Sequence, residues 1–169
     1  MAKPTVPKSK INEEAESLQD KTIALNDIEA KIFDLPKFKK DGTKENSLKR
    51  NPYVILKYFQ EGWECFSDWE KGELKLFSSF LKTLSSHTWE TVYKSGGKGE
   101  NKSGLGYTSY KLDDMKNGSN HLKDVRKNIS EDLNFFELRV SQKIRIHGFQ
   151  SQAAFFLVLL DKNHRVFPQ

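Results

Sequence analysis

The segment FELRVSQKIRIHGF, residues 136–149, concentrates side chains that can bind a phosphate and move a proton. Arginine holds phosphate through its planar, forked guanidinium group. Histidine titrates near neutral pH, and a neighbouring carboxylate can orient it or act as a base. The segment therefore has the residue types for phosphate chemistry, provided that the backbone brings these side chains together.

The alternation of apolar and charged residues in this segment predicts a β-hairpin. If Val140 and Ile144 both face the core, they must be paired, and residues 141–143 form the turn. A two-residue turn would instead pair Val140 with Lys143 and place a core residue opposite a charge. We therefore expect the three-residue connection.

This register gathers charged side chains on the face of the hairpin that points away from the core. Arg139 then lies opposite Arg145, and Glu137 lies opposite His147. Like charges that face each other across a sheet are unfavourable unless an anion lies between them. The sequence allows two interpretations: a solvated polar face, or a phosphate-binding site.

The stretch DKNHRVFP, residues 161–168, adds Asp161, His164 and Arg165 after an apolar segment. Its composition is typical of a β-turn capped by aspartate. In the alternative, His164 or Arg165 approaches the hairpin face from a neighbouring strand. The few dispersed histidines and the single cysteine, Cys65, do not form a metal-site pattern, so we predict no metal and no cofactor.

Positioning these side chains requires a sheet and helices. Residues 136–140, 144–149 and 153–160 predict a three-stranded antiparallel meander whose third strand is buried, and YVILKYF, residues 53–59, predicts an earlier strand. An apolar stripe predicts a helix over 68–85, with Ser67 and Glu70 as a capping box. We expect a short helix after Ser86 or Thr88, and further helical turns around 122–129.

The predicted fold class is α+β: a small antiparallel sheet packed on two or three helices, with an N-terminal helical extension. Residues 51–169 form one domain with a glycine-rich loop at 95–106, and residues 1–50 form a flexible tail, an amphipathic helix over 12–33 and a linker. The glycine-rich loop lacks the strand-to-helix context of a phosphate-binding loop.

The formal net charge of +5 is compatible with a nucleic-acid partner. Tyr107 and Tyr110, close to the glycine-rich loop, are candidates for stacking on bases. The longest apolar run, residues 153–160, is too short to span a bilayer, and the N-terminus lacks the apolar core of a signal peptide. We therefore expect a cytoplasmic protein with no membrane association.

Residues 53–167 resemble, in layout, the ribonuclease toxins of the RelE and YoeB type. The similarity in sequence is confined to FFELRVSQKIRIHGFQSQAAFFLVLLDKNHRVF, in which an arginine-bearing strand precedes an F-x-V-x-x-D strand. The same stretch is also similar to the ends of small bacterial proteins of unassigned function. Those proteins share a K-x-R-x-x-G strand followed by F-F-x-x-x-x-D-x-x-H.

The resemblance implies a metal-independent endoribonuclease in a toxin–antitoxin or phage-defence setting, with RNA as the partner and residues 12–33 docking a second protein. The implied catalytic residues are Glu137 as base, Arg145 on the phosphate, and His147 or His164 as acid. Arg139, Lys143 and Arg165 would bind the nucleic acid. The N-terminal extension, the insertion at 95–106 and a C-terminus without the usual catalytic ending depart from those toxins.

Two further functions are compatible with the sequence. The hairpin face can bind nucleic acid without cleaving it, or the 12–33 helix can be the working part of a protein–protein adaptor.

Overall fold

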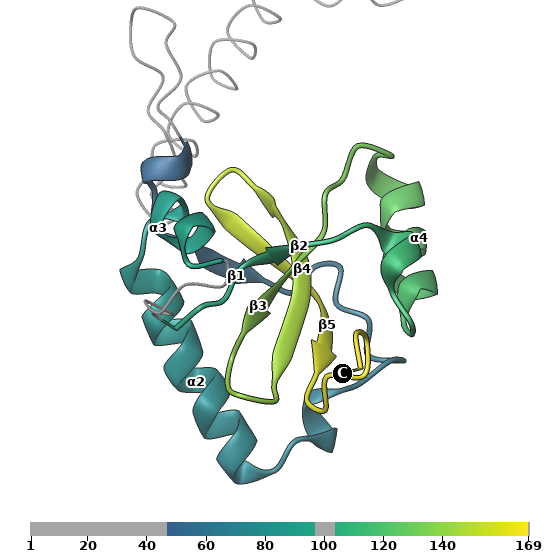
Figure 1. Cartoon of the computed structure of the whole chain (residues 1–169), viewed down its shortest axis with the longest axis horizontal. Helices are drawn as coiled ribbons and strands as arrows, with labels where there is room; N and C mark the ends of the chain where they lie inside the picture. The colour runs from purple at the N-terminus through teal and green to yellow at the C-terminus, as the bar shows by residue number, and fades with distance from the viewer. Residues whose placement is uncertain (1–46, 97–103, 169) are drawn as a thin grey trace, which may run out of the picture. The chain divides into compact units, whose positions relative to one another are not determined.

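The structure, a computed structural model, describes residues 47–96 and 104–168 (Figure 1). The predicted tail, the 12–33 helix and most of the linker lie outside the described residues and stay predictions, as does the centre of the 95–106 loop. The chain divides into residues 1–45 and 46–169, and every element below belongs to the second unit.

Five strands form one sheet in the order β1-β5-β4-β3-β2. The antiparallel meander of β3, β4 and β5 is confirmed, and so is the α+β fold. The expectation of a wholly antiparallel sheet is wrong, because β1 pairs with β5 in parallel. A long connection separates these two strands in the sequence, so no hairpin turn fixes their direction. The strands are β1 Tyr53–Ile55, β2 Thr108–Ser109, β3 Phe136–Arg139, β4 Arg145–Ser151 and β5 Ala154–Asp161.

Three α-helices and three short 3₁₀ turns accompany the sheet. The helices are α2 Lys71–Ser86, α3 Trp89–Lys94 and α4 Ser119–Ile129, and the turns are η1 Ser47–Lys49, η2 Phe66–Asp68 and η3 Leu112–Asp114.

The helix starts follow local capping. The predicted box of Ser67 and Glu70 is wrong, because Ser67 lies inside η2 and lacks the extended backbone of a cap. Instead, Glu70 caps α2, and its N–H donates to Glu73 Oε2 at 2.8 Å. Thr88 caps α3, as the sequence allowed.

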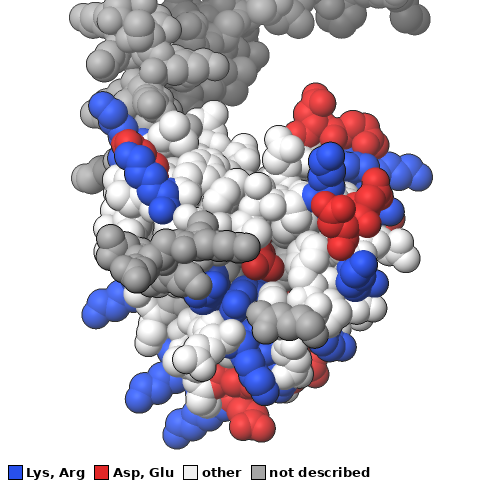
Figure 2. All heavy atoms as spheres, in the orientation of Figure 1, with Lys and Arg blue, Asp and Glu red and all other residues white. Residues whose placement is uncertain are grey.

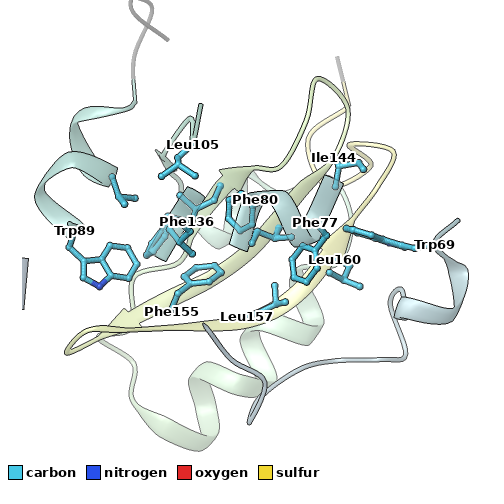
Figure 3. Packing of buried hydrophobic residues seen from close by; sticks show 14 residues of the cluster. Trp69, Phe77, Phe80, Trp89, Leu105, Phe136, Ile144, Phe155, Leu157 and Leu160 are labelled. Carbon is cyan, nitrogen blue, oxygen red and sulfur yellow. The ribbon is translucent and has the colours of Figure 1, made fainter. Parts of the chain in front are cut away.

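Apolar side chains bury both faces of the sheet. Figure 3 shows one cluster, in which Phe77 and Phe80 from α2 and Trp89 from α3 pack on Phe136 and Phe155 of the sheet. The second cluster covers the other face and is built from α4, the segment before it and the chain's end. Its buried members are Leu112, Met115, Leu122, Val125, Phe135, Phe149, Val158, Leu159 and Val166.

A bulge interrupts the pairing of β4 and β5 between His147 and Gly148. A Cβ atom at Gly148 would lie 2.0 Å from the main-chain oxygen of Phe156 and 2.8 Å from Phe155 Cζ. Only glycine lets the two strands approach here, and the bulge re-aims the side chains next to it.

Within the described part of the chain, none of the helices has both the length and the apolar character needed to cross a membrane.

Candidate functional site

The hairpin has the predicted register. Glu137 is paired with His147 and Arg139 with Arg145. The Val140 N–H donates to the Ile144 carbonyl at 3.0 Å, so residues 141–143 form the turn. The guanidinium of Arg145 closes this turn by donating to the Ser141 carbonyl at 2.8 Å.

The expected open face of the hairpin is covered. Glu137 and Arg145 are almost fully buried, and His147 has 0% of its surface exposed. The reason is that Leu112, Met115 and the apolar side of α4 need a surface to pack on, and this face of the sheet provides it. The prediction of a solvated face pointing away from the core is therefore wrong.

Beneath this apolar layer, polar side chains contact one another in series. The Tyr110 hydroxyl lies 2.9 Å from His147 Nδ1, and His147 Nε2 lies 3.6 Å from Asp161 Oδ2. The carboxylate of Asp161 accepts the N–H groups of Arg165 at 2.7 Å and Val166 at 3.0 Å. This arrangement fixes the turn after β5 and the segment that carries Tyr110.

The pKa values of these groups follow from their surroundings. Burial by itself would raise the pKa of Asp161, but His147 and the N–H groups of Val166 and Arg165 stabilise the anion and hold the pKa below its ordinary value. Burial raises the pKa of Tyr110 well above its ordinary value, and the charges of Glu137 and Asp161 raise it further. Asp161 is therefore a carboxylate and Tyr110 a neutral phenol at neutral pH.

His147 does not meet the requirement of the acid role that the resemblance implied. A general acid must reach the atom to which it gives its proton. His147 is enclosed, and its two ring nitrogens face Tyr110 and Asp161. Its position is that of a side chain that holds others in place.

Glu137 lies at the edge of this buried network, with 11% of its side chain exposed. Its Oε1 is 3.7 Å from Arg145 Nε, and its Oε2 is 3.9 Å from Nε2 of His164, which is 20% exposed. Oε2 accepts no hydrogen bond. His164 reaches this place because its backbone is left-handed, with φ of 54°. The structure thus brings Glu137, Arg145 and His164 together, as predicted for a shared site.

Burial lowers the pKa of Arg145 from its high ordinary value. The charge of Glu137 opposes this, while the neighbouring Arg139 reinforces it. The charge of Asp161 also opposes the effect of burial, so the two arginines lie among two carboxylates.

Arg139 is half-buried, and its Nε has no hydrogen-bond acceptor. Gly106 packs against it with φ of 50°, and a Cβ atom there would lie 3.1 Å from both Cβ and Nε of Arg139. The Arg139 N–H donates to the Leu105 carbonyl at 2.7 Å. The backbone at 105–106 therefore sets the position of this arginine.

The two remaining predicted binding residues differ. Lys143 is exposed at the tip of the hairpin. Arg165 is held elsewhere: its guanidinium is 3.3 Å from the buried carboxylate of Glu64 and stacks on the Trp63 ring at 4.5 Å. Arg165 thus lies against Glu64 and Trp63 with 48% of its side chain exposed, and its role as a nucleic-acid contact stays a prediction.

Two residues of this region make contacts that the sequence did not predict. Glu64, which is buried, accepts hydrogen bonds from Trp69 Nε1 at 2.5 Å and from the Lys162 N–H at 3.1 Å. Tyr110, predicted as a stacking residue, instead contacts His147 and also lines a groove of about 490 Å³ beside α4. The bond between Glu64 and Lys162 and the contact between Tyr110 and His147 join segments far apart along the chain, so no residue spacing in the sequence signals them.

The described residues contain no group of three or more His, Cys, Asp or Glu side chains arranged to hold a metal ion.

Comparison of the chain with family models, with curated proteins and with solved structures gives no match. The resemblance to the RelE and YoeB toxins stays a prediction.

Proposed function

We propose that the protein is a metal-independent endoribonuclease that cleaves RNA at a phosphate, with Glu137 as the general base. The observation that carries the proposal is a concentration of buried polar atoms without hydrogen-bond partners. Within the described residues, such atoms include Glu137 Oε2 and Arg139 Nε, both on β3. Buried polar atoms are normally satisfied, so a cluster of exceptions favours a ligand that completes them.

The chemistry follows from the residue types. Glu137 accepts the proton of a ribose 2′-hydroxyl, whose oxygen attacks the adjacent phosphorus, and the bond to the 5′-oxygen breaks. His164 donates a proton to that leaving oxygen. The products are a 2′,3′-cyclic phosphate and a 5′-hydroxyl. Because the nucleophile belongs to the substrate, the protein needs to supply only orientation and cations for the phosphate.

Three cations on the β3–β4 hairpin differ in exposure. Arg145 is buried and fixed by the turn, Arg139 is half-buried, and Lys143 is exposed. In Figure 2, basic side chains gather over the β3–β4 hairpin around a small acidic area. This order of exposure suits a phosphate that approaches from solvent and reaches the more deeply buried arginines.

The test is cleavage of a single-stranded RNA by the full chain in the presence of a metal chelator. We expect a cyclic phosphate end, and no cleavage when the ribose at the scissile position is replaced by deoxyribose. Glu137→Gln should lower the rate by about 100-fold or more. Glu131→Gln, at an exposed position, is the matched control. Intact RNA after incubation with folded wild-type protein would overturn the proposal.

The burial of His147 and of most of Glu137 favours a second candidate, a module that binds RNA without cleaving it. In the same experiment it predicts salt-dependent retention of intact RNA that tolerates deoxyribose substitution.

A further inference from the structure

Helix α2 carries a face made of lysine and serine. Lys71, Lys75 and Lys82 are separated by four and seven residues, which places them within about 40° of one another around the helix axis. All three are exposed. They lie opposite the side of the helix that buries Phe77, Phe80 and Leu84. We call these three residues the lysine face.

Negative charge is missing from the lysine face. The single acidic residue of α2, which is described along its whole length, is Glu73. Its Oε2 accepts hydrogen bonds from the Glu70 N–H at 2.8 Å and from Lys162 Nζ at 3.2 Å, so it is already neutralised. The serines between the lysines, such as Ser78 and Ser79, direct their hydroxyl hydrogens to carbonyls of the preceding turn. The lysine charges are therefore available to an external anion.

The lysine face continues toward the candidate site. The Glu70 N–H bond lowers the pKa of Glu73 most, and the charges of Lys162 and Lys143 lower it further against a small opposing effect of burial. Lys162, two residues before His164, has its Nζ 3.2 Å from Glu73 Oε2 in the first turn of α2, so this end of the lysine face lies near the turn that carries His164. In Figure 2, basic side chains lie along the edge formed by α2 and over the hairpin, with acidic side chains at the lower end between them.

We propose that the lysine face of α2 binds the phosphate backbone of the RNA strand that flanks the cleaved position. The proposal rests on the proposed function for the choice of partner. From Lys71 to Lys82 the helix rises by about 17 Å, which spans several phosphates of one strand. Lysine is a flexible point charge, so this contact holds RNA of any sequence, while the arginines of the hairpin hold one phosphate in a fixed geometry.

The experiment measures binding of a 2′-O-methyl oligonucleotide, which cannot be cleaved by this mechanism, to the full chain at a series of salt concentrations. In the variant K71Q/K75Q/K82Q, the slope of log Kobs against log salt should become less negative by about 2, since each single-strand phosphate contact contributes about 0.7. If wild type and variant bind equally at about 1 M salt, this change in slope makes the variant bind roughly 100-fold more weakly than wild type at about 0.1 M salt.

The matched control is K111Q/K116Q/K127Q, which removes the same charge from exposed positions around η3 and α4. Its slope should stay at the wild-type value. Equal slopes for the two triple variants, or a wild-type slope in the α2 variant, would overturn the lysine face as a binding surface. Loss of binding to phosphatidylserine vesicles without loss of RNA binding would assign the face to a membrane instead, and would also overturn the proposal.

The two proposals fail differently. If wild-type protein binds the oligonucleotide through α2 but leaves ordinary RNA intact, the ribonuclease proposal fails and the lysine face stands. If wild-type protein cleaves RNA and the α2 variant binds and cleaves it equally well, the lysine face fails alone.

Discussion

Asp161 is the buried carboxylate whose removal we expect to cost the most stability. It has 0% of its surface exposed, and it accepts two main-chain N–H groups, from Arg165 and Val166. Its Oδ2 also faces His147 at 3.6 Å. Asp161→Ala would leave these donors without their acceptor in a place that water does not reach.

The magnitude follows from the number of groups left unsatisfied. A buried donor without a partner costs about 1–3 kcal/mol, and breaking a buried charged contact costs about 3–5 kcal/mol in total. We therefore expect Asp161→Ala to lower the free energy of unfolding by about 4 kcal/mol. Asp161→Asn keeps one accepting oxygen and should lose roughly half of that amount.

The effect should also depend on pH. The pKa of Asp161 lies below its ordinary value in the folded protein, so the unfolded chain takes up the proton first as the pH falls. The stabilisation is complete above the unfolded pKa, about 3.9, and is lost as the pH falls from there through the folded pKa. The difference between wild type and Asp161→Asn should be constant near neutral pH and shrink below about pH 4, by at most about 1.4 kcal/mol per pH unit.

Urea unfolding of the full chain, followed by the fluorescence of its buried tryptophans and repeated from neutral pH to about pH 3, measures both quantities. Asp132→Asn, at an exposed position, is the control and should match wild type. Parallel stability curves for wild type and Asp161→Asn across the whole pH range would refute the reasoning, as would an Asp161→Ala protein as stable as wild type.

Two further substitutions test the supports of the site. Gly106→Ala adds a Cβ atom at a residue with φ of 50°, and this atom would lie 3.1 Å from Arg139 Nε. The substitution should lower the free energy of unfolding, measured by thermal unfolding, by about 1–2 kcal/mol and should weaken RNA binding. Unchanged values for both would contradict the role of Gly106. Tyr110→Phe removes the hydroxyl that lies 2.9 Å from His147 Nδ1. It should lower the free energy of unfolding by about 1–2 kcal/mol and shift the imidazole signal of His147 in NMR spectra. An unshifted signal would show that the contact is not made.

The hairpin register was predictable because a side-chain period of two allows few alternatives. Once Val140 and Ile144 were assigned to one face, the pairing of Glu137 with His147 followed, and the structure has it. The direction of β1 was not predictable, since no turn connects it to β5. Periodicity therefore determines local pairing, whereas the order and direction of distant strands depend on packing.

The cover over the hairpin could have been inferred from β5. Its continuous apolar run places large side chains on both faces of the sheet, as the adjacent residues Leu159 and Leu160 illustrate in the two separate clusters. A strand buried on both faces requires a second layer over its neighbours as well. The sequence contained this signal, but it did not say that η3 and α4 supply the layer.

The lysine face could not be predicted from the sum of charges along the sequence. Residues 61–94 contain more acidic than basic side chains, so this part of the chain is slightly acidic on average. The acidic residues fall mostly outside α2, and the helical period collects Lys71, Lys75 and Lys82 on one side. Surface charge is therefore set by periodicity rather than by the local sum.

The energetics of the hairpin favour function over stability as the reason for its charges. The shortest contact between Glu137 and Arg145 is 3.7 Å, longer than the short, forked geometry that makes a buried ion pair favourable. The partnerless atoms of Glu137 and Arg139 together cost about 2–6 kcal/mol, against a total stability of about 5–15 kcal/mol for an ordinary domain. In the proposed reaction, a ribose hydroxyl donates to Glu137 Oε2 and a phosphate oxygen accepts from Arg139 Nε. If that proposal holds, an RNA strand would satisfy both atoms, while a strand without the 2′-hydroxyl would leave the carboxylate unpaired and bind less well.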